Sequence, residues 1–486
     1  MTCDIEKPIL VVVAFDIPGH TIGLKRVSQH LIRKGYKVYF ITGPNMRRDV
    51  EKTGAVVVET QFCSQDVVKN RPVKNSSGDR WAGFKHVFGD STAAAHRTLR
   101  ETLESIRKEH PRREVVIVHE TLASAVGPFL YGAPLPEGYS AFPKVVNFHT
   151  TVCYSTDGRT PPFGPGLPYD PTPENLALWR SMSEAVAPGT AELTDYYNTI
   201  YKSLGSTRPI QGRLPDALMD FGDITVLPMS PSLEYPPIAR KQGLRFIGGL
   251  PSAPIDPDFQ PPTWWPTITA NAALPADAPD RKKVVFVSQG TVHRDLSDLM
   301  VPTFEALADR EDVIVVAVLG ARGAELTVPH DNHNDKDNGD AAAAAAAPAA
   351  VAVPANALMA DYLPYDAILP HADAFVSNAG FGGVMHGVMH GVPLVLWGAK
   401  ADKAEVCARA ERAGIAVNMR CQRPGPDTIR AAVDRVLWEP CFRERARELQ
   451  RENWELDAFG KMEDIILELA GGGAAVTAAE AGEAAK

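Results

Sequence analysis

The segment that decides the fold reads FVSNAGFGGVMH from Phe375 to His386, followed by GVP at 391–393 and DK at 402–403. The apolar run at 373–377 predicts a buried strand, and the residues from about 384 to 389 predict a helix. Between them lies a turn with three glycines, Gly380, Gly382 and Gly383. Such a turn brings backbone N–H groups and a helix N-terminus to one point, as in many diphosphate sites. The spacing is not the dinucleotide fingerprint, because G-x-G-x-x-G counted from Gly380 needs a glycine where Met385 stands.

The same alternation of strand and helix extends over the rest of the chain. An apolar run at 9–15, an amphipathic segment at 21–34 and a second apolar run at 37–42 predict a β–α–β unit, and therefore a parallel sheet. The second half repeats the pattern, with predicted strands at 283–288, 313–319 and 394–397 and a predicted helix at 296–309. We therefore expect an α/β fold of two doubly wound domains, with ligands at the carboxyl ends of the strands.

The length of 486 residues exceeds what one ordinary core organises, so two domains are expected. Within the second domain, 330–355 contains seven consecutive alanines and is expected to be a disordered insertion. The full expected division is an N-terminal Rossmann-like domain at 1–250, a proline-rich linker region at 251–282, a C-terminal Rossmann-like domain at 283–440, helices that close the fold at 441–470, and a flexible tail at 471–486.

Composition narrows the classes of function. A net charge of −9 without any Lys/Arg-rich segment argues against a nucleic-acid partner. The six cysteines show no metal-binding spacing, so neither a zinc site nor a disulfide framework is expected. The chain has no uninterrupted apolar run of about 18 residues, so no membrane span is expected. The lead-in to the first strand is too short and too acidic for a signal peptide, which predicts a cytoplasmic protein.

Two further motifs stand at predicted strand ends. Pro18-Gly19-His20 follows the first strand, where an imidazole that titrates near neutrality can take a proton from a hydroxyl. The alternative is a histidine that merely caps the following helix, expected from Thr21. In the second half, Gly290 and Thr291 follow the strand at 283–288, where the glycine allows close approach of the backbone and the hydroxyl can contact a phosphate. An ordinary turn has the same composition.

Together and in this order, these motifs resemble those of the UDP-glycosyltransferases, in the fungal and microbial variant Asn-x-Gly-aromatic-Gly-Gly that starts at Asn378. The resemblance implies the GT-B architecture, in which two Rossmann-like domains face each other across an interdomain cleft. It implies that the domain at 1–250 binds the acceptor and that the domain at 283–440 binds the nucleotide sugar. It implies a diphosphate site at Thr291, Asn378, Gly380, Gly382 and Gly383.

The resemblance also implies roles for individual side chains. The general base is His20, and Glu120 is the candidate that supports it as the second catalytic residue, with His119 as a rival. The uridine is expected at Tyr362, Leu363 and His386, and the transferred sugar at Asp402 and Lys403. The alternatives are purely structural roles: a loop tyrosine at 362, a packed histidine at 386 and a helix-capping Asp402. Four residues depart from the usual family pattern, namely Glu120, Asn378, His386 and Lys403.

The predicted reaction is an inverting transfer of a sugar, with glucose expected, from a UDP-sugar to a small, rather apolar acceptor such as a secondary metabolite, sterol or lipid. No metal or other cofactor is expected, because backbone dipoles take the place of a cation at the diphosphate. Alternatives are a nucleotide-sugar epimerase or glycan phosphorylase of the same architecture, or an inactive relative that binds a ligand or activates a partner. The acceptor pocket is expected among five residues, which are His149, Thr150, Thr151, Phe163 and Tyr169.

Overall fold

A computed structural model of the protein describes residues 6–63, 81–239, 241–253, 255, 259–290, 295–320, 322–324, 327–328, 349–399, 401–421 and 423–471. Of the insertion predicted at 330–355, the part up to 348 lies outside the described residues, as does the tail beyond Gly471. Contacts divide the chain into two compact units that are not continuous in sequence. Unit 1 comprises Met1–Pro162, Tyr169–Leu250 and Asn453–Lys486, and unit 2 comprises Phe163–Pro168 and Pro251–Glu452. The domain boundaries expected from the sequence stay predictions.

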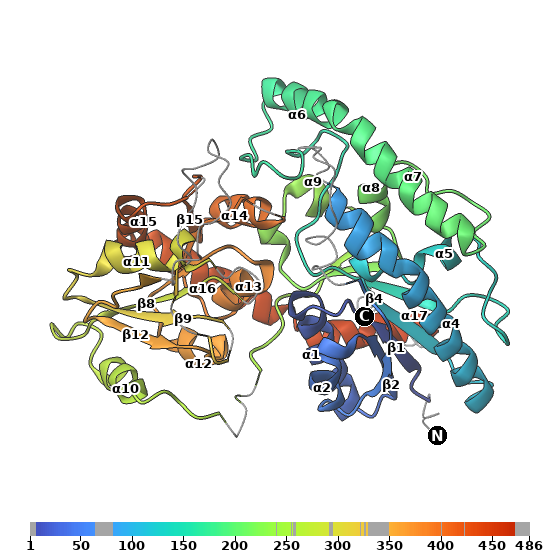
Figure 1. Ribbon diagram of the computed structural model, residues 1–486, viewed down its shortest axis with the longest axis horizontal. Helices are drawn as coiled ribbons and strands as arrows, with labels where there is room; N and C mark the ends of the chain where they lie inside the picture. Colours follow the sequence, from blue (N-terminus) through green and yellow to red (C-terminus); the bar gives the residue numbers. More distant parts are fainter. Residues whose placement is uncertain are drawn as a thin grey trace, which may run out of the picture. The chain divides into compact units, whose positions relative to one another are not determined.

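Unit 1 is built on a seven-stranded sheet whose neighbouring strands are all parallel (Figure 1). The apolar runs of the sequence form its central strands, which are buried because helices cover both faces. In spatial order the strands are β3 (Val56–Glu59), β2 (Val38–Thr42), β1 (Ile9–Val13), β4 (Val115–Glu120), β5 (Lys144–Phe148), β6 (Ile224–Leu227) and β7 (Leu244–Phe246).

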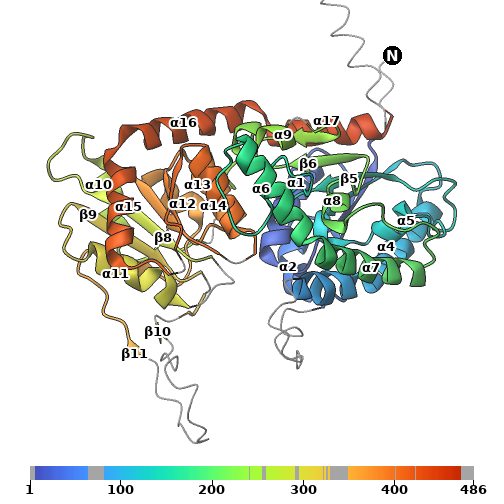
Figure 2. The ribbon, with the colours of Figure 1, turned by 90° about the horizontal axis from the view of Figure 1, so that it is seen from above.

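Two helices from opposite ends of the chain share one face of this sheet. Leu24 and Val27 of α1 (Pro18–Arg33) pack in the same core as Met462 and Ile466 of α17 (Ala458–Leu469), and α17 lies beside α1 (Figure 2). The other face carries α4 (Asp90–Glu109). Further helical elements of unit 1 are α2 (Pro44–Glu51), the π-helical turn η1 (Phe84–Gly89), α5 (Gly127–Leu130), α6 (Pro173–Ala185), α7 (Ala187–Ser203), α8 (Leu214–Leu218) and α9 (Pro236–Ala239).

Unit 2 holds a six-stranded parallel sheet of the same kind. Its order is β12 (Ala357–Ala360), β9 (Val313–Val318), β8 (Lys283–Ser288), β13 (Ala374–Ser377), β14 (Leu394–Leu396) and β15 (Ala416–Asn418). A short antiparallel pair is formed by β10 (Thr327–Val328) and β11 (Ala349–Ala350), and β11 lies within the segment predicted as a disordered insertion. The helices are α10 (Trp265–Ala273), α11 (Met300–Leu307), α12 (Tyr365–Ile368), α13 (Phe381–Met389), α14 (Lys403–Arg412), α15 (Pro426–Trp438) and α16 (Pro440–Glu455).

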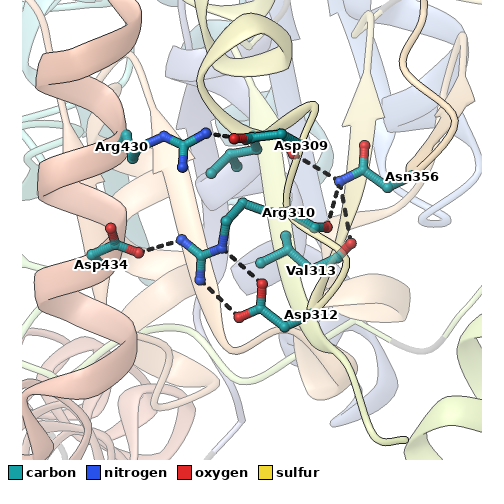
Figure 3. A network of polar contacts seen from close by, with 8 residues as sticks. Asp309, Arg310, Asp312, Val313, Asn356, Arg430 and Asp434 are labelled. Carbon is teal, nitrogen blue, oxygen red and sulfur yellow. Dashed lines mark hydrogen bonds and ion pairs between the residues drawn. The ribbon is translucent and has the colours of Figure 1, made fainter.

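A polar network ties α11, β9, β12 and α15 together at the edge of unit 2 (Figure 3). Arg310, between α11 and β9, pairs with Asp312 and reaches Asp434 on α15. Asn356, just before β12, donates from Nδ2 to the backbone carbonyls of Leu307, Arg310 and Val313 at 2.8, 3.0 and 3.3 Å. The network therefore fixes the point at which the chain enters two neighbouring strands.

The predicted α/β fold with two parallel-sheet domains is confirmed, while several helices begin elsewhere than expected. Helix α1 begins at Pro18, because proline is suited to the first helical position, so His20 lies in the first turn of the helix and not in a loop before it. Helix α13 begins at Phe381, directly after Gly380. The helix expected at 296–309 is a 3₁₀ turn (Leu296–Asp298) followed by α11. Among the described helices, none is long and apolar enough to cross a membrane.

Candidate functional site

The carboxyl ends of three neighbouring strands of unit 1 bring together a histidine and a carboxylate. β1, β4 and β5 are adjacent in the sheet, and His20 follows β1 while Glu120 ends β4. His20 Nδ1 lies 3.1 Å from Glu120 Oε1; the His20 side chain is 22% exposed and that of Glu120 is fully buried. The sequence placed both residues at strand ends, and the fold makes them a contacting pair.

The surroundings of Glu120 favour a carboxylate. Its Oε1 accepts hydrogen bonds from the backbone N–H of Leu122 and the hydroxyl of Thr150, each at 3.1 Å. Burial alone would raise the pKa of the Glu120 carboxyl, but His20 and these hydrogen bonds lower it below its usual value. A negative charge at this point stabilises an imidazolium form of His20 and orients its ring.

Two other histidines near this edge differ from His20 in their contacts. His119 is fully buried, with Nε2 2.6 Å from the carbonyl oxygen of Phe221 and Nδ1 3.0 Å from that of Glu120. His149, directly after β5, is also buried, and neither of its ring nitrogens has a hydrogen-bond partner among the described residues. Burial lowers the pKa of His149 to about 4, so its imidazole is neutral near pH 7.

An aromatic cluster surrounds His20, which the sequence pattern did not indicate. The ring of His20 lies 5.6 Å from that of Phe88 and 6.1 Å from that of Phe15. Phe15 in turn packs at 4.5 Å on Phe62, and Phe88 at 5.7 Å on Phe84. Phe84 and Phe88 belong to η1, and π-helical turns occur frequently at functional sites. The cluster makes the surroundings of the imidazole apolar.

The other residues expected at the acceptor are divided between the two units. Thr150 contacts Glu120, as described above, and Thr151 follows it in the chain. Tyr169 stacks on Tyr235 at 5.0 Å and on Trp179 at 5.8 Å, within unit 1. Phe163 belongs to unit 2.

In unit 2, the glycine turn lies between the end of β13 and α13. Ala379 has a left-handed backbone with φ +59°, which is strained for a residue with a Cβ, and Gly380 then serves as the N-cap of α13. Gly382 and Gly383 lie in the first turn of the helix, and a Cβ built on Gly382 would meet nothing within 4 Å. The turn therefore presents helix N–H groups with little side-chain cover, which suits an anion.

The neighbouring strand β8 supports this turn through Gln289. Asn378 Nδ2 donates to the carbonyl oxygen of Gln289 at 2.5 Å. The buried side chain of Gln289 donates to the carbonyl of Asp295 at 2.7 Å and accepts from the N–H of Met300 at 3.1 Å. Gln289 thus links the end of β8 to Asp295 and to the start of α11, while Thr291 lies outside the described residues. No sequence pattern indicated this role of Gln289.

His386 and His390 share one carboxylate on α12. His386 Nδ1 and His390 Nε2 lie 2.9 and 3.0 Å from Asp366 Oδ1, and the N–H of Ala253 donates to Asp366 Oδ2 at 2.9 Å. Burial opposes ionisation of Asp366, but the hydrogen bonds from both imidazoles lower the pKa of this carboxyl well below its usual range. His386 is therefore oriented through Asp366, which the sequence did not indicate.

The residues expected at the uridine differ in exposure. Tyr362 is 39% exposed, and the guanidinium of Arg322 lies 4.6 Å from the centre of its ring. Leu363 is buried at 2% exposure, so only its backbone is suited to a base. The tyrosine can offer an aromatic face to a nucleobase.

Asp402 and Lys403 open helix α14, with Asp402 as its N-cap residue. The residue before them, Ala401, has a left-handed backbone with φ +55°, like Ala379 in the glycine turn. A Cβ built on Gly380 would lie 3.7 Å from Lys403 Nζ and 4.0 Å from Asn378 Oδ1. The structure therefore brings Asn378, Gly380 and Lys403 to one point.

A strap formed by residues 163–168 holds the first turn of α14 from the side. The backbone N–H groups of Gly164 and Gly166 donate to Glu405 Oε1 at 2.8 and 2.9 Å. Glu405 also pairs with Arg409 at 3.2 Å, and both side chains are buried. The buried pair thus fixes the part of α14 that carries Asp402 and Lys403.

Comparisons with known proteins identify relatives of this chain. Residues 340–457 match the family model described as Erythromycin biosynthesis protein CIII-like, C-terminal domain. UDP-glucosyltransferase 1 of Beauveria bassiana (strain ARSEF 2860) is 35% identical over 475 residues, which cover 96% of this chain and 96% of that protein. UDP-glycosyltransferase 2 of Phaeomoniella chlamydospora is 30% identical over 481 residues, or 97% of each chain. The 4'-demethylrebeccamycin synthase of Lentzea aerocolonigenes is 30% identical over 461 residues, with 92% and 96% covered.

Solved structures share the fold over nearly the whole chain. The glycotransferase of kitacinnamycin superposes with a TM-score of 0.65 at 19% identity, covering 95% of this chain and 99% of that one. The calicheamicin glycosyltransferase CalG4 superposes with a TM-score of 0.64 at 17% identity, covering 96% and 99%. At these identities the likeness concerns the fold alone.

Proposed function

This chain belongs to the UDP-glycosyltransferase family, and we propose that it transfers a sugar, with glucose expected, from a UDP-sugar to a hydroxyl of a small, rather apolar acceptor. The chain has the GT-B architecture and is a UDP-dependent glycosyltransferase. The proposed transfer to an acceptor hydroxyl rests on the pair formed by His20 and Glu120, in which Nδ1 and Oε1 lie 3.1 Å apart.

The proposed step is a single displacement with inversion. His20 takes the proton of the acceptor hydroxyl at Nε2, because Nδ1 faces Glu120. The acceptor oxygen forms a bond to the anomeric carbon while the bond from that carbon to UDP breaks, and the electron pair leaves on the β-phosphate. Glu120 holds the imidazole in place and stabilises the imidazolium that results.

Unit 2 is proposed to hold the donor. Thr291, Asn378 and the glycines 380, 382 and 383 receive the diphosphate, since the turn offers N–H groups and the positive end of the α13 dipole. Tyr362, Leu363 and His386 receive the uridine, and Asp402 with Lys403 receives the sugar hydroxyls. The proposed reaction needs no metal or other cofactor, because these groups supply the stabilisation of charge.

The aromatic cluster supports the proposed class of acceptor. The rings of Phe15 and Phe88 lie 6.1 and 5.6 Å from that of His20. An acceptor whose hydroxyl reaches His20 would therefore pack its carbon skeleton against these aromatic rings. A phenol, polyketide, sterol or lipid alcohol satisfies this condition, whereas a strongly hydrated acceptor would lose its hydration there.

The test combines calorimetric titration with a transfer assay. Wild-type protein and His20→Ala are titrated with UDP and UDP-glucose, and UDP release is measured with a panel of phenols and sterols. We expect His20→Ala to abolish transfer and to leave UDP affinity unchanged. His110→Ala, which removes a surface histidine of the same unit, is the matched control and keeps full turnover.

Each contrary outcome removes a different part of the proposal. Unchanged turnover in His20→Ala would exclude His20 as the base. UDP binding without transfer to any acceptor would favour the inactive relative that the sequence left open. Absence of binding to every uridine nucleotide would remove the donor assignment itself.

A further inference from the structure

The ammonium group of Lys403 lies over the glycine turn. Lys403 is the first residue of α14, and a Cβ built on Gly380, the N-cap of α13, would lie 3.7 Å from Lys403 Nζ. The side chain of Asn378 borders the same point, with Oδ1 4.0 Å from that Cβ position. The cation therefore lies at the N-terminus of α13 and faces its first turn.

Gly398 leaves room for the aliphatic part of the Lys403 side chain. A Cβ on Gly398, which follows β14, would lie 2.6 Å from Lys403 Cβ and 3.1 Å from its Cδ. Any larger residue at 398 would overlap the stem, because neither atom is the far end of a flexible side chain. Glycine at this position thus holds Lys403 against the backbone and limits where its Nζ can point.

The charge of Lys403 is not matched by a protein partner in the described part of unit 2. Burial lowers the pKa of Lys403, and the charge of the neighbouring Asp402 opposes this only partly. No hydrogen bond or ion pair of Nζ is present among the described residues. The positive end of the α13 dipole adds to the unfavourable environment. A cation held in this way is expected to receive an anion from outside the protein.

We propose that Lys403 binds the β-phosphate of the nucleotide donor and stabilises the charge that UDP acquires as it leaves. This inference rests on the proposed function and adds a phosphate contact to the sugar contact expected for Lys403. An ammonium has three donors, so it can serve a phosphate oxygen and a sugar hydroxyl together. When the bond from the anomeric carbon to UDP breaks, the electron pair stays on the β-phosphate oxygen next to Nζ, and no proton leaves the lysine.

In this role Lys403 supplies the positive charge that the glycine turn lacks for a dianionic leaving group. Asn378 contributes no charge, and one of the two N–H donors of its amide is engaged with the carbonyl of Gln289. The glycines contribute backbone dipoles, equivalent to about half a charge at a helix N-terminus. Lys403 adds a full positive charge where the charge of the leaving group develops, which is the condition for electrostatic stabilisation of the transition state.

The test compares nucleotides that differ by one phosphate. Wild type, Lys403→Met and the control Lys282→Met, which removes an exposed lysine of the same unit, are titrated with UMP, UDP and UDP-glucose. We expect Lys403→Met to weaken UDP binding about tenfold or more while UMP binding falls less than about threefold, because a charge-assisted hydrogen bond to the β-phosphate is lost. Lys282→Met is expected to match wild type with all three ligands.

The outcomes separate this inference from the proposed function. A wild type that binds no UDP removes both. A Lys403→Met protein that binds UDP as wild type does but UDP-glucose more weakly overturns the phosphate role and leaves Lys403 to the sugar. Equal losses for UMP and UDP also overturn it. Lys403→Gln, which keeps a hydrogen-bond donor without the charge, is measured alongside and is expected to lose the preference for UDP over UMP in the same way, so the comparison does not depend on the folding of one variant.

Discussion

Replacement of Glu120 by glutamine tests the charge behind the proposed base with almost no change in shape. The amide keeps an Oε1 that can accept from the N–H of Leu122 and the hydroxyl of Thr150. What disappears is the negative charge 3.1 Å from His20 Nδ1. At an effective dielectric constant of about 20, two unit charges at this distance attract by about 5 kcal/mol.

This energy sets the expected loss of rate. If half of the proton's charge has reached His20 in the transition state, about 2–3 kcal/mol is lost, or roughly a hundredfold in kcat. Complete transfer would give about 10⁴-fold. We therefore expect Glu120→Gln to lower kcat by about 10²–10⁴-fold, measured as UDP release at saturating UDP-glucose and acceptor, with the Kd for UDP unchanged.

Thr150→Val is the matched control for this experiment. It removes one 3.1 Å hydrogen bond to the same oxygen and keeps the charge, so kcat should fall by about tenfold at most. A folded Glu120→Gln protein that keeps a third or more of wild-type kcat would refute the electrostatic reasoning. Equal losses in the two variants would do so as well, because they would make hydrogen bonding, and not charge, the source of the effect.

Two further predictions concern stability. A Cβ on Gly382 meets nothing within 4 Å, so Gly382→Ala should stabilise the ligand-free protein by about 0.5–1 kcal/mol in urea unfolding while weakening UDP in calorimetry, because the methyl enters the space proposed for the diphosphate. Burial lowers the pKa of His149 from 6.5 to about 4. As the pH falls from 6.5 towards 4, this histidine is protonated in the unfolded chain but stays neutral in the folded protein, which destabilises the folded state. Wild type should lose about 2 kcal/mol between pH 7 and pH 5 from this group, and His149→Leu should not; equal pH dependence in both would contradict the assignment.

The backbone architecture was predictable because its strongest signals are local. The run from Lys283 to Ser288 is a strand with the bounds that its apolar pattern predicted, and the strands β1 and β2 lie close to their expected positions. Helix starts were less predictable. Glycine and proline were taken as loop residues, yet Pro18 and Gly382 lie in first helical turns, where proline fits and where glycine is tolerated if a helix N-terminus must stay bare.

The candidate site was predictable wherever a strand end identifies it. His20 and Glu120 follow from that rule, and the alternation of side chains along β4 then sends His119 to Phe221 and Glu120 to His20. Contacts between segments far apart in sequence were not predictable. Gln289, whose carbonyl accepts from Asn378, and Asp366, which orients two histidines, carry no periodic or compositional signal. The strap at 163–168 joins unit 2 although its neighbours in sequence belong to unit 1.

Three residues beside the proposed donor site are unfavourable for folding. Ala379 and Ala401 have left-handed backbones, each at a cost of about 1–2 kcal/mol, and they stand next to Asn378 and Asp402. Lys403 is a cation over a helix N-terminus without a described partner. Selection for stability alone would remove such features, since glycine at 379 or methionine at 403 would relieve them. Their position at the carboxyl ends of β13 and β14 is instead what a site needs if it must turn the backbone N–H groups and one positive charge towards an anionic ligand.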